Sequence, residues 1–185
     1  MDEFSAALMA GGNSIRMGRD KTMLLQDGVP LWQRQVSILH TLEPRELFVS
    51  GKLRPEWEGF EVVEDEQSGF GPLGGIVSCL HRCTASRLLV LAADMPKMTG
   101  EYLRSLLSAS NGAIPKIGEF FEPLAAVYPK EALPIAERLL QSRQLSLQTL
   151  AAELVHKGLA FAIEVQPTER QLFANWNHPE DCTQP

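Results

Sequence analysis

The sequence predicts an α/β fold: a single Rossmann-like domain of three layers with a mainly parallel sheet, spanning residues 1–185. Short apolar runs alternate with amphipathic stretches along most of the chain, a pattern typical of crossover units between parallel strands. The run from Arg87 to Ala93 is apolar on both faces, as expected of a central strand that helices cover. A chain of 185 residues is long enough for one well-buried domain and short for two.

The order of the expected elements follows from periodicity and from glycine and proline positions. The expected strands cover residues 6–10, 47–50, 60–63, 87–93 and 159–165. The expected helices cover residues 31–40, a stretch from Gly71 through Cys83, and residues 100–108, 130–141 and 146–155, with Thr99 as the cap of the third. Residues 113–115 and 122–128 are expected as strands joined across Gly118, and their prolines favour edge positions in the sheet.

The composition excludes several classes of protein. The net charge is −6 at pH 7, which argues against a nucleic-acid-binding face and leaves room for a local basic pocket. No apolar run approaches the roughly 20 residues that span a bilayer, and the acidic start of the chain is unlike a secretory signal, so we expect a cytoplasmic protein without membrane contact. Cys79 and Cys83 lie four residues apart and are expected as small core residues; together with Cys182 they form no zinc pattern.

The most informative segment is the glycine-rich stretch that follows the first expected strand. Gly11 and Gly12 let the backbone approach a polyanion, while Arg16 and Lys21 supply two cations. The spacing matches neither a Walker A loop nor a dinucleotide-binding Gly-x-Gly turn. An ordinary strand-to-helix turn is the alternative, but the combined pattern favours a phosphate-binding loop.

Two carboxylates are expected at the same edge of the sheet, because each follows the end of a predicted parallel strand. Asp94 follows the most apolar strand and is the first candidate for a magnesium ligand; a turn or helix-cap aspartate is the alternative. Asp65 follows the strand that ends at Val63 and is a candidate nucleotide contact, although a solvated acidic run would also explain it.

Several motifs resemble those of the molybdenum cofactor guanylyltransferases, within the wider nucleotidyltransferase family. They are the loop 8–21, Asp27-Gly28-Val29-Pro30-Leu31, Gly71-Pro72-Leu73-Gly74-Gly75-Ile76, Ala93-Asp94-Met95-Pro96, Glu122-Pro123-Leu124-Ala125-Ala126-Val127-Tyr128 and Asn175-Trp176-Asn177-His178-Pro179-Glu180-Asp181. The resemblance covers nearly the whole chain and implies a single nucleotidyltransferase domain. Three positions depart from the family pattern: Ser50 stands where asparagine is frequent, Gly74 replaces alanine and His178 replaces threonine.

The resemblance also implies an activity: transfer of GMP from magnesium-bound GTP to the terminal phosphate of molybdenum-loaded molybdopterin, with release of pyrophosphate. It implies Lys21, Arg16 and Asp94 as the catalytic residues, Asp94 as the magnesium ligand, and Asn175 and Asn177 as neighbours of molybdopterin. The implied nucleotide contacts are Met9, Ala10, Gly11, Gly12, Lys21, Ser50, Asp65 and Asp94. Molybdoenzyme maturation proteins are candidate partners. A cytidylyltransferase that uses CTP and a non-catalytic nucleotide-binding accessory protein remain as alternatives.

Overall fold

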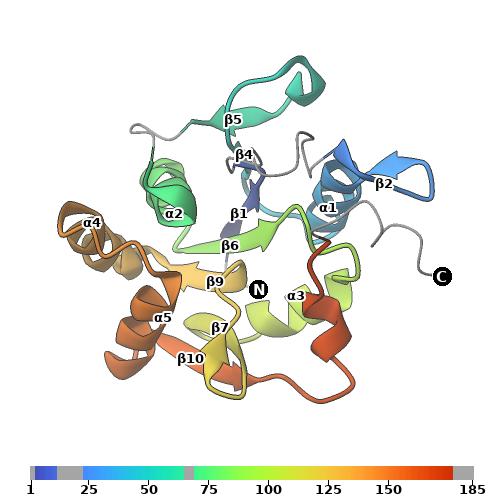
Figure 1. Ribbon diagram of the computed structural model, residues 1–185. Helices are drawn as coiled ribbons and strands as arrows, with labels where there is room; N and C mark the ends of the chain where they lie inside the picture. Colours follow the sequence, from blue (N-terminus) through green and yellow to red (C-terminus); the bar gives the residue numbers. More distant parts are fainter. Residues whose placement is uncertain (1–2, 12–22, 65–68, 177–185) are drawn as a thin grey trace.

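The computed structural model describes residues 3–11, 23–64 and 69–176, and Figure 1 shows their arrangement. The strands are β1 (Phe4–Met9), β2 (Leu25–Gln26), β3 (Val29–Pro30), β4 (Leu47–Ser50), β5 (Glu61–Val63), β6 (Arg87–Ala92), β7 (Gly112–Ile117), β8 (Phe120–Phe121), β9 (Ala125–Pro129) and β10 (Ala160–Glu164). The α-helices are α1 (Leu31–His40), α2 (Gly71–Arg82), α3 (Gly100–Leu107), α4 (Leu133–Gln141) and α5 (Leu147–His156). The described residues also include the short 3₁₀ helices η3 (Pro55–Trp57), η4 (Lys130–Ala132) and η5 (Arg170–Phe173).

The main sheet has the strand order β10-β7-β9-β6-β1-β4-β5, and β8 adds to β7. Strand β1 lies between β4 and β6 and is parallel to both, and β5 continues the parallel set beyond β4. Strand β9 is antiparallel to β6 and to β7, whereas β10 is parallel to β7. The expected mainly parallel sheet is therefore confirmed, and β9 is the one long strand of the described chain that runs against it.

Helices cover both faces of the sheet, which gives the expected three layers. One core joins one face of the sheet to α1 and α3 and includes Trp32, Val36 and Leu103. The other core joins the opposite face to α2, α4 and α5 and includes Ile76, Leu139 and Leu154. Figure 1 shows α2, α4 and α5 on the left and α1 and α3 on the right. Burying two apolar faces is what makes the central strands apolar throughout.

Most predicted elements are confirmed, including the helix over residues 31–40. Thr99 caps α3, because its hydroxyl oxygen accepts a hydrogen bond from the N–H of Tyr102 over 3.2 Å. Cys79 and Cys83 are buried in the core beneath α2, as expected of small apolar residues. Among the described residues, no helix is both long and apolar enough to cross a membrane. The single-domain organisation of the chain stays a prediction.

The prediction that the proline-containing strands lie at edges was wrong, because β7 and β9 are both inside the sheet. The carbonyl oxygen of Pro115 accepts a hydrogen bond from the N–H of Glu122 over 2.8 Å, on the side where β7 turns into its hairpin. In an extended strand the N and the carbonyl of one residue point to the same side. The missing N–H of Pro115 therefore faces that turn, and the pairing with β10 loses no donor.

The β2–β3 hairpin was not predicted. Asp27 and Gly28 form its turn, with φ values of 53° and 78°. Two consecutive residues with positive φ are what a tight hairpin turn of type I′ requires, and Asp-Gly is a frequent pair there. The strands have only two residues each, too few to show alternation in the sequence.

Candidate nucleotide site

The site is built on the carboxyl ends of the four neighbouring parallel strands β5, β4, β1 and β6. Main-chain hydrogen bonds continue beyond the strands: Gly51 N–H donates to the carbonyl of Val63 over 3.0 Å, and Ala10 N–H donates to that of Ser50 over 2.9 Å. Ala93 N–H then donates to the carbonyl of Met9 over 3.2 Å. These three bonds fix the starting points of the loops that leave this edge, where open α/β sheets bind ligands.

The start of the glycine-rich segment lies at the centre of this edge. Met9 and Ala10 are buried, and Gly11 is exposed at the surface. Ser50 is buried beside them on β4, with its carbonyl oxygen bonded to Ala10. Gly12, Arg16 and Lys21 lie outside the described residues. The structure thus brings Met9, Ala10, Gly11 and Ser50 together, and their contact with a nucleotide stays a prediction.

Gly51 is a close neighbour of the glycine-rich segment that sequence reasoning missed. A Cβ atom at this position would lie 3.1 Å from the backbone N of Gly11, 3.2 Å from Cη2 of Trp57 and 3.3 Å from the carbonyl carbon of Ala10. Contacts of this length leave no room for a side chain unless the neighbours shift. Gly51 also has a φ of 156°. The only sequence signal was a glycine directly after an expected strand.

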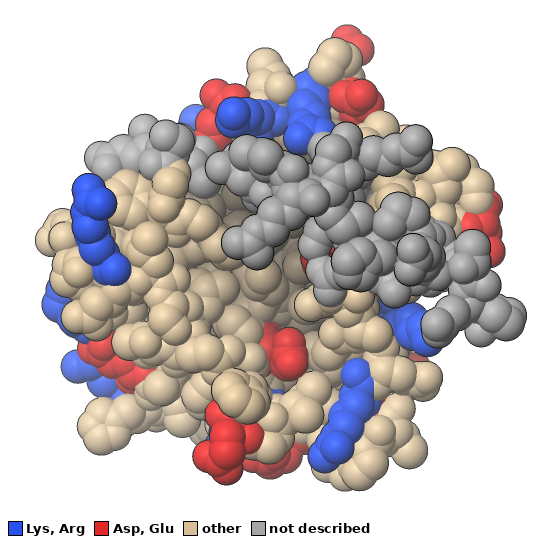
Figure 2. Space-filling model, viewed as in Figure 1, with Lys and Arg blue, Asp and Glu red and all other residues tan. Residues whose placement is uncertain are grey.

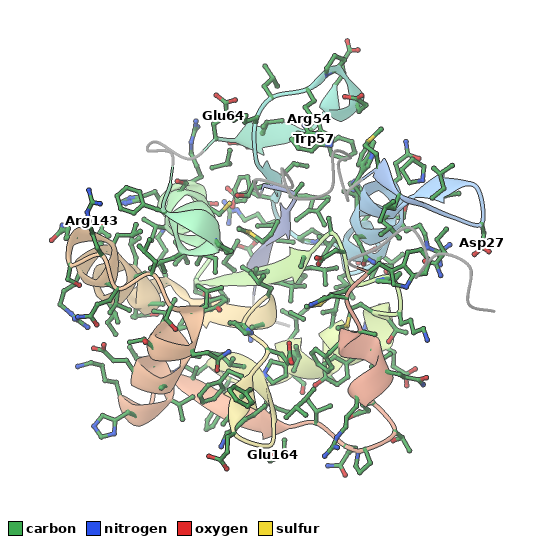
Figure 3. All side chains as sticks on the ribbon, viewed as in Figure 1. Asp27, Arg54, Trp57, Glu64, Arg143 and Glu164 are labelled. Carbon is green, nitrogen blue, oxygen red and sulfur yellow. The ribbon has the colours of Figure 1, made fainter. Side chains whose placement is uncertain are left out.

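The loop after Gly51 is held over the edge by a buried aromatic side chain. Trp57 is 1% exposed, and the guanidinium carbon of Arg54 lies 5.1 Å from the centre of its ring. Glu64 accepts a hydrogen bond at Oε1 from the N–H of Leu53 over 2.8 Å, which ties the loop to the end of β5. Figure 3 shows Arg54, Trp57 and Glu64 gathered at the top of the molecule around β5. Asp65, the next residue, lies outside the described chain.

Asp94 lies where the sequence placed it, in the turn directly after β6, and it is half-buried. Its main-chain carbonyl accepts a hydrogen bond from the N–H of Trp176 over 3.0 Å. The next carbonyl along, that of Met95, accepts one from Nε2 of the fully buried Gln35 on α1 over 2.7 Å. Helix α1 and the carboxyl-terminal tail therefore hold this turn from two directions.

Gln35 and Trp176 were not predicted to have these roles. Gln35 sits on the apolar face of a helix, where the sequence gives no reason to expect a polar contact 60 residues away. Trp176 acts through its backbone, which no side-chain pattern reveals. Asn175, exposed beside Trp176, lies next to the residue bonded to Asp94, whereas Asn177 lies outside the described residues.

Helix α2 begins at the same edge, after the loop that follows β5. Gly71 is its first residue and Pro72 its second, a position where proline costs no helical hydrogen bond. Gly74 and Gly75 are buried within α2, so their small size lets the helix approach the sheet. Figure 2, in the view of Figure 1, shows the molecule hollowed near its centre over β1 and β6, with mostly uncharged atoms around the hollow.

The donor set suits magnesium bound together with a nucleotide better than a site made by protein alone. Within residues 3–11, 23–64 and 69–176, no three His, Cys, Asp or Glu side chains gather as a metal site. Asp94 offers a hard carboxylate oxygen at the ligand edge, and Mg²⁺ typically takes one or two carboxylates together with phosphate oxygens and water. The described residues therefore fit a magnesium ion that arrives with a triphosphate.

The sheet order and the position of its ligand edge belong to an α/β fold that a solved nucleotidyl transferase from Methanothermobacter shares. The crystal structure of molybdopterin-guanine dinucleotide biosynthesis protein A from Archaeoglobus fulgidus has the same fold, with a TM-score of 0.75, 24% identity, and coverage of 96% of this chain and 94% of that one. Residues 6–157 match the sequence-family model of the MobA-like NTP transferase domain, and the chain belongs to that family.

Curated relatives extend the similarity to nearly the whole chain. A probable molybdenum cofactor guanylyltransferase from Opitutus terrae is 38% identical in an alignment of 185 positions, gaps included, that covers 96% of this chain and 92% of the relative. A molybdenum cofactor guanylyltransferase from Xanthomonas euvesicatoria is 30% identical over 96% of this chain and 91% of its own length. The resemblance found in the motifs is thus confirmed at the level of the family.

Proposed function

We propose that this protein transfers GMP from GTP to the terminal phosphate of molybdenum-loaded molybdopterin and releases pyrophosphate. Family membership and the names of the relatives support this activity. The observation that carries it is the position of Asp94, which main-chain bonds to Met9 (through Ala93) and to Trp176 hold beside the start of the glycine-rich segment. This position of the turn supports a role for the Asp94 carboxylate near the phosphates of a bound nucleotide.

The chemistry requires little from the side chains beyond placement and charge. An oxygen of the acceptor phosphate attacks the α-phosphorus of GTP, the bond from that phosphorus to the bridging oxygen breaks, and its electron pair leaves with pyrophosphate. The acceptor phosphate is already an anion, so no side-chain base has to remove a proton. Catalysis then depends on alignment and on spreading the negative charge.

Each candidate residue has a role in this proposal. Magnesium bound with the triphosphate would supply positive charge at the phosphates, and Asp94 would hold it. The backbone of Met9, Ala10, Gly11 and Gly12, with Ser50 and Asp65, would bind the nucleotide. Lys21 would neutralise charge at the α-phosphate and Arg16 at the departing pyrophosphate, while Asn175 and Asn177 would contact molybdopterin. The cytoplasmic location and any maturation partners stay predictions.

The test is pyrophosphate release from GTP, CTP, ATP and UTP, each with and without molybdopterin. We expect release with GTP only when molybdopterin and Mg²⁺ are both present, and formation of a product that contains guanine. Equal release with CTP would instead make the protein a cytidylyltransferase. Nucleotide binding without release under any condition would support the accessory-protein alternative.

A further inference from the structure

Four consecutive residues that precede β9, Phe121 to Leu124, are each fixed by hydrogen bonds from elsewhere in the fold. The side chain of Gln148 on α5 bonds to both main-chain groups of Phe121: its Oε1 accepts from the N–H over 2.9 Å and its Nε2 donates to the carbonyl over 2.8 Å. The hydroxyl of the fully buried Tyr128 donates to the carbonyl of Pro123 over 2.7 Å. These hydrogen bonds fix the position of the segment, as a binding site requires of the residues that form it.

This segment reaches the ligand edge directly beside Asp94. The carbonyl of Leu124 accepts a hydrogen bond from the N–H of Ala92, the last residue of β6, over 2.7 Å. The antiparallel register of β6 and β9 pairs Leu91 with Ala125. Asp94 lies three residues after Leu91, and Glu122 lies three residues before Ala125, so the two residues are level with each other across β6 and β9. Glu122 therefore belongs to the same edge, on the opposite side of Asp94 from β1, β4 and β5.

The carboxyl group of Glu122 has no hydrogen-bond or ion-pair partner among residues 3–11, 23–64 and 69–176. Its main-chain N–H donates to Pro115 over 2.8 Å and its carbonyl accepts from Ala125 over 3.2 Å. The side chain is half-buried. Burial raises the pKa of this carboxyl, because the carboxylate loses water without gaining a donor.

Tyr102 on α3 interacts electrostatically with this carboxyl. Its hydroxyl is buried and has no hydrogen-bond partner among the residues that the structure describes. Burial, together with the negative charges of Glu169 and Glu122, raises the pKa of Tyr102 to about 12. Its ring packs edge-on against Phe173, with centroids 5.3 Å apart. The charges of Glu122 and Glu169 thus both act on Tyr102, whose ring packs against the segment 170–176 that reaches Asp94.

The negative charge and the two oxygens of the Glu122 carboxylate favour one kind of ligand. Phosphate groups are repelled, whereas two adjacent N–H donors on a flat ring match the two oxygens of a carboxylate. A 2-amino-4-oxopyrimidine ring has this edge, and both guanine and pterin contain it. The nucleotide elements lie at β1, β4 and β5, on the other side of Asp94. We propose that Glu122 binds the aminopyrimidinone edge of the pterin acceptor, an inference that rests on the proposed function and names the contact made by its second substrate.

The test compares Glu122→Gln in the full chain with Glu119→Gln, a matched change at an exposed position of the preceding hairpin. The probes are unsubstituted pterin and lumazine, which has an oxygen in place of the 2-amino group, titrated by fluorescence at pH 7. We expect wild-type protein and Glu119→Gln to bind pterin at least tenfold more tightly than lumazine. Glu122→Gln should lose that preference and keep its melting temperature.

Guanine and pterin have the same aminopyrimidinone edge, and titrations with Mg-GTP and Mg-ITP show which of the two rings Glu122 binds. We expect Glu122→Gln to bind both nucleotides as wild type does, because the proposal places Glu122 away from the nucleotide base. Mg-ITP tests the amino group itself, since inosine differs from guanosine only by the missing amino group. Weaker GTP binding with unchanged pterin binding would assign the contact to guanine and overturn the proposal. Equal pterin binding by wild type and Glu122→Gln would also overturn it. These titrations need no turnover, so their outcome is independent of whether GMP transfer is observed.

Discussion

The backbone N–H of Trp176 donates a hydrogen bond to the main-chain carbonyl of Asp94 over 3.0 Å, which joins the carboxyl-terminal tail to the turn after β6. Trp176 is 9% exposed, so its side chain is largely buried. The neighbouring Asn175 is exposed to solvent. The proposed magnesium ligand and a proposed molybdopterin contact are therefore held in one place, as a reaction between two bound substrates requires.

Replacing Asp94 by asparagine should separate folding from metal-dependent catalysis. The hydrogen bonds from Trp176 and Gln35 to this turn end on main-chain carbonyls, so the fold should be retained and circular dichroism should be unchanged. Loss of the carboxylate charge should lower guanylyl transfer at least a hundredfold, about 2.7 kcal/mol in the barrier. The measurement is transfer across a magnesium titration, with EDTA-treated wild type as the reference. Near-normal turnover at low magnesium would place the metal elsewhere, with Asp65 or Asn177 as the next candidates.

Base selectivity should favour GTP over CTP by about tenfold or more, which corresponds to about 1.4 kcal/mol. The prediction rests on the Met9-Ala10-Gly11-Gly12 turn and on the Gly71-Pro72-Leu73 segment. Competing turnover in a mixture of the two nucleotides gives the ratio of kcat/KM values directly. A ratio at or below one would refute the guanylyl assignment without affecting the fold or the reaction class.

Gln35→Met should lower activity without lowering stability. The amide holds the carbonyl of Met95 over 2.7 Å, but within the described part of the chain its own Oε1 is buried without a partner. Methionine fills a similar volume and removes that unpaired oxygen, at the cost of leaving the Met95 carbonyl unpaired, so the free energy of unfolding should change by only about 1 kcal/mol. Looser positioning of the adjacent Asp94 should raise the magnesium concentration needed for half-maximal activity severalfold.

The control for this substitution is Gln33→Met, which places the same residue on the exposed face of α1. It should alter neither the magnesium requirement nor the melting temperature. If both variants behave like wild type in the magnesium titration, Gln35 has only a packing role.

Gly51→Ala should weaken nucleotide binding. Its Cβ would meet the N of Gly11 at 3.1 Å and the ring of Trp57 at 3.2 Å, so the start of the glycine-rich segment has to move. We expect the Kd for Mg-GTP to rise about tenfold and stability to fall by about 1–3 kcal/mol. Gly59→Ala is the control, because Gly59 also has a positive φ, of 89°, but a Cβ there would contact nothing within 4 Å. Equal losses of affinity in both variants would show that backbone strain, and not the contact, is responsible.

Periodicity predicted the elements that bury long apolar faces, and it located Asp94 because a continuous apolar strand ends just before it. It failed where local preferences yield to the surrounding fold. Pro115 suggested an edge strand, yet its missing donor faces a turn inside the sheet. The contacts of Gln35 and Gly51 depend on distant segments that meet only after folding. No pattern local to either residue could indicate them.

Three main-chain hydrogen bonds link the loops of this site: Gly51 to Val63, Ala10 to Ser50 and Ala93 to Met9. Backbone atoms make every one of these bonds, so substituting a side chain such as Ser50 removes none of them. Selectivity for the nucleotide base can therefore drift, or be redesigned, while the spacing between the loop and Asp94 is preserved.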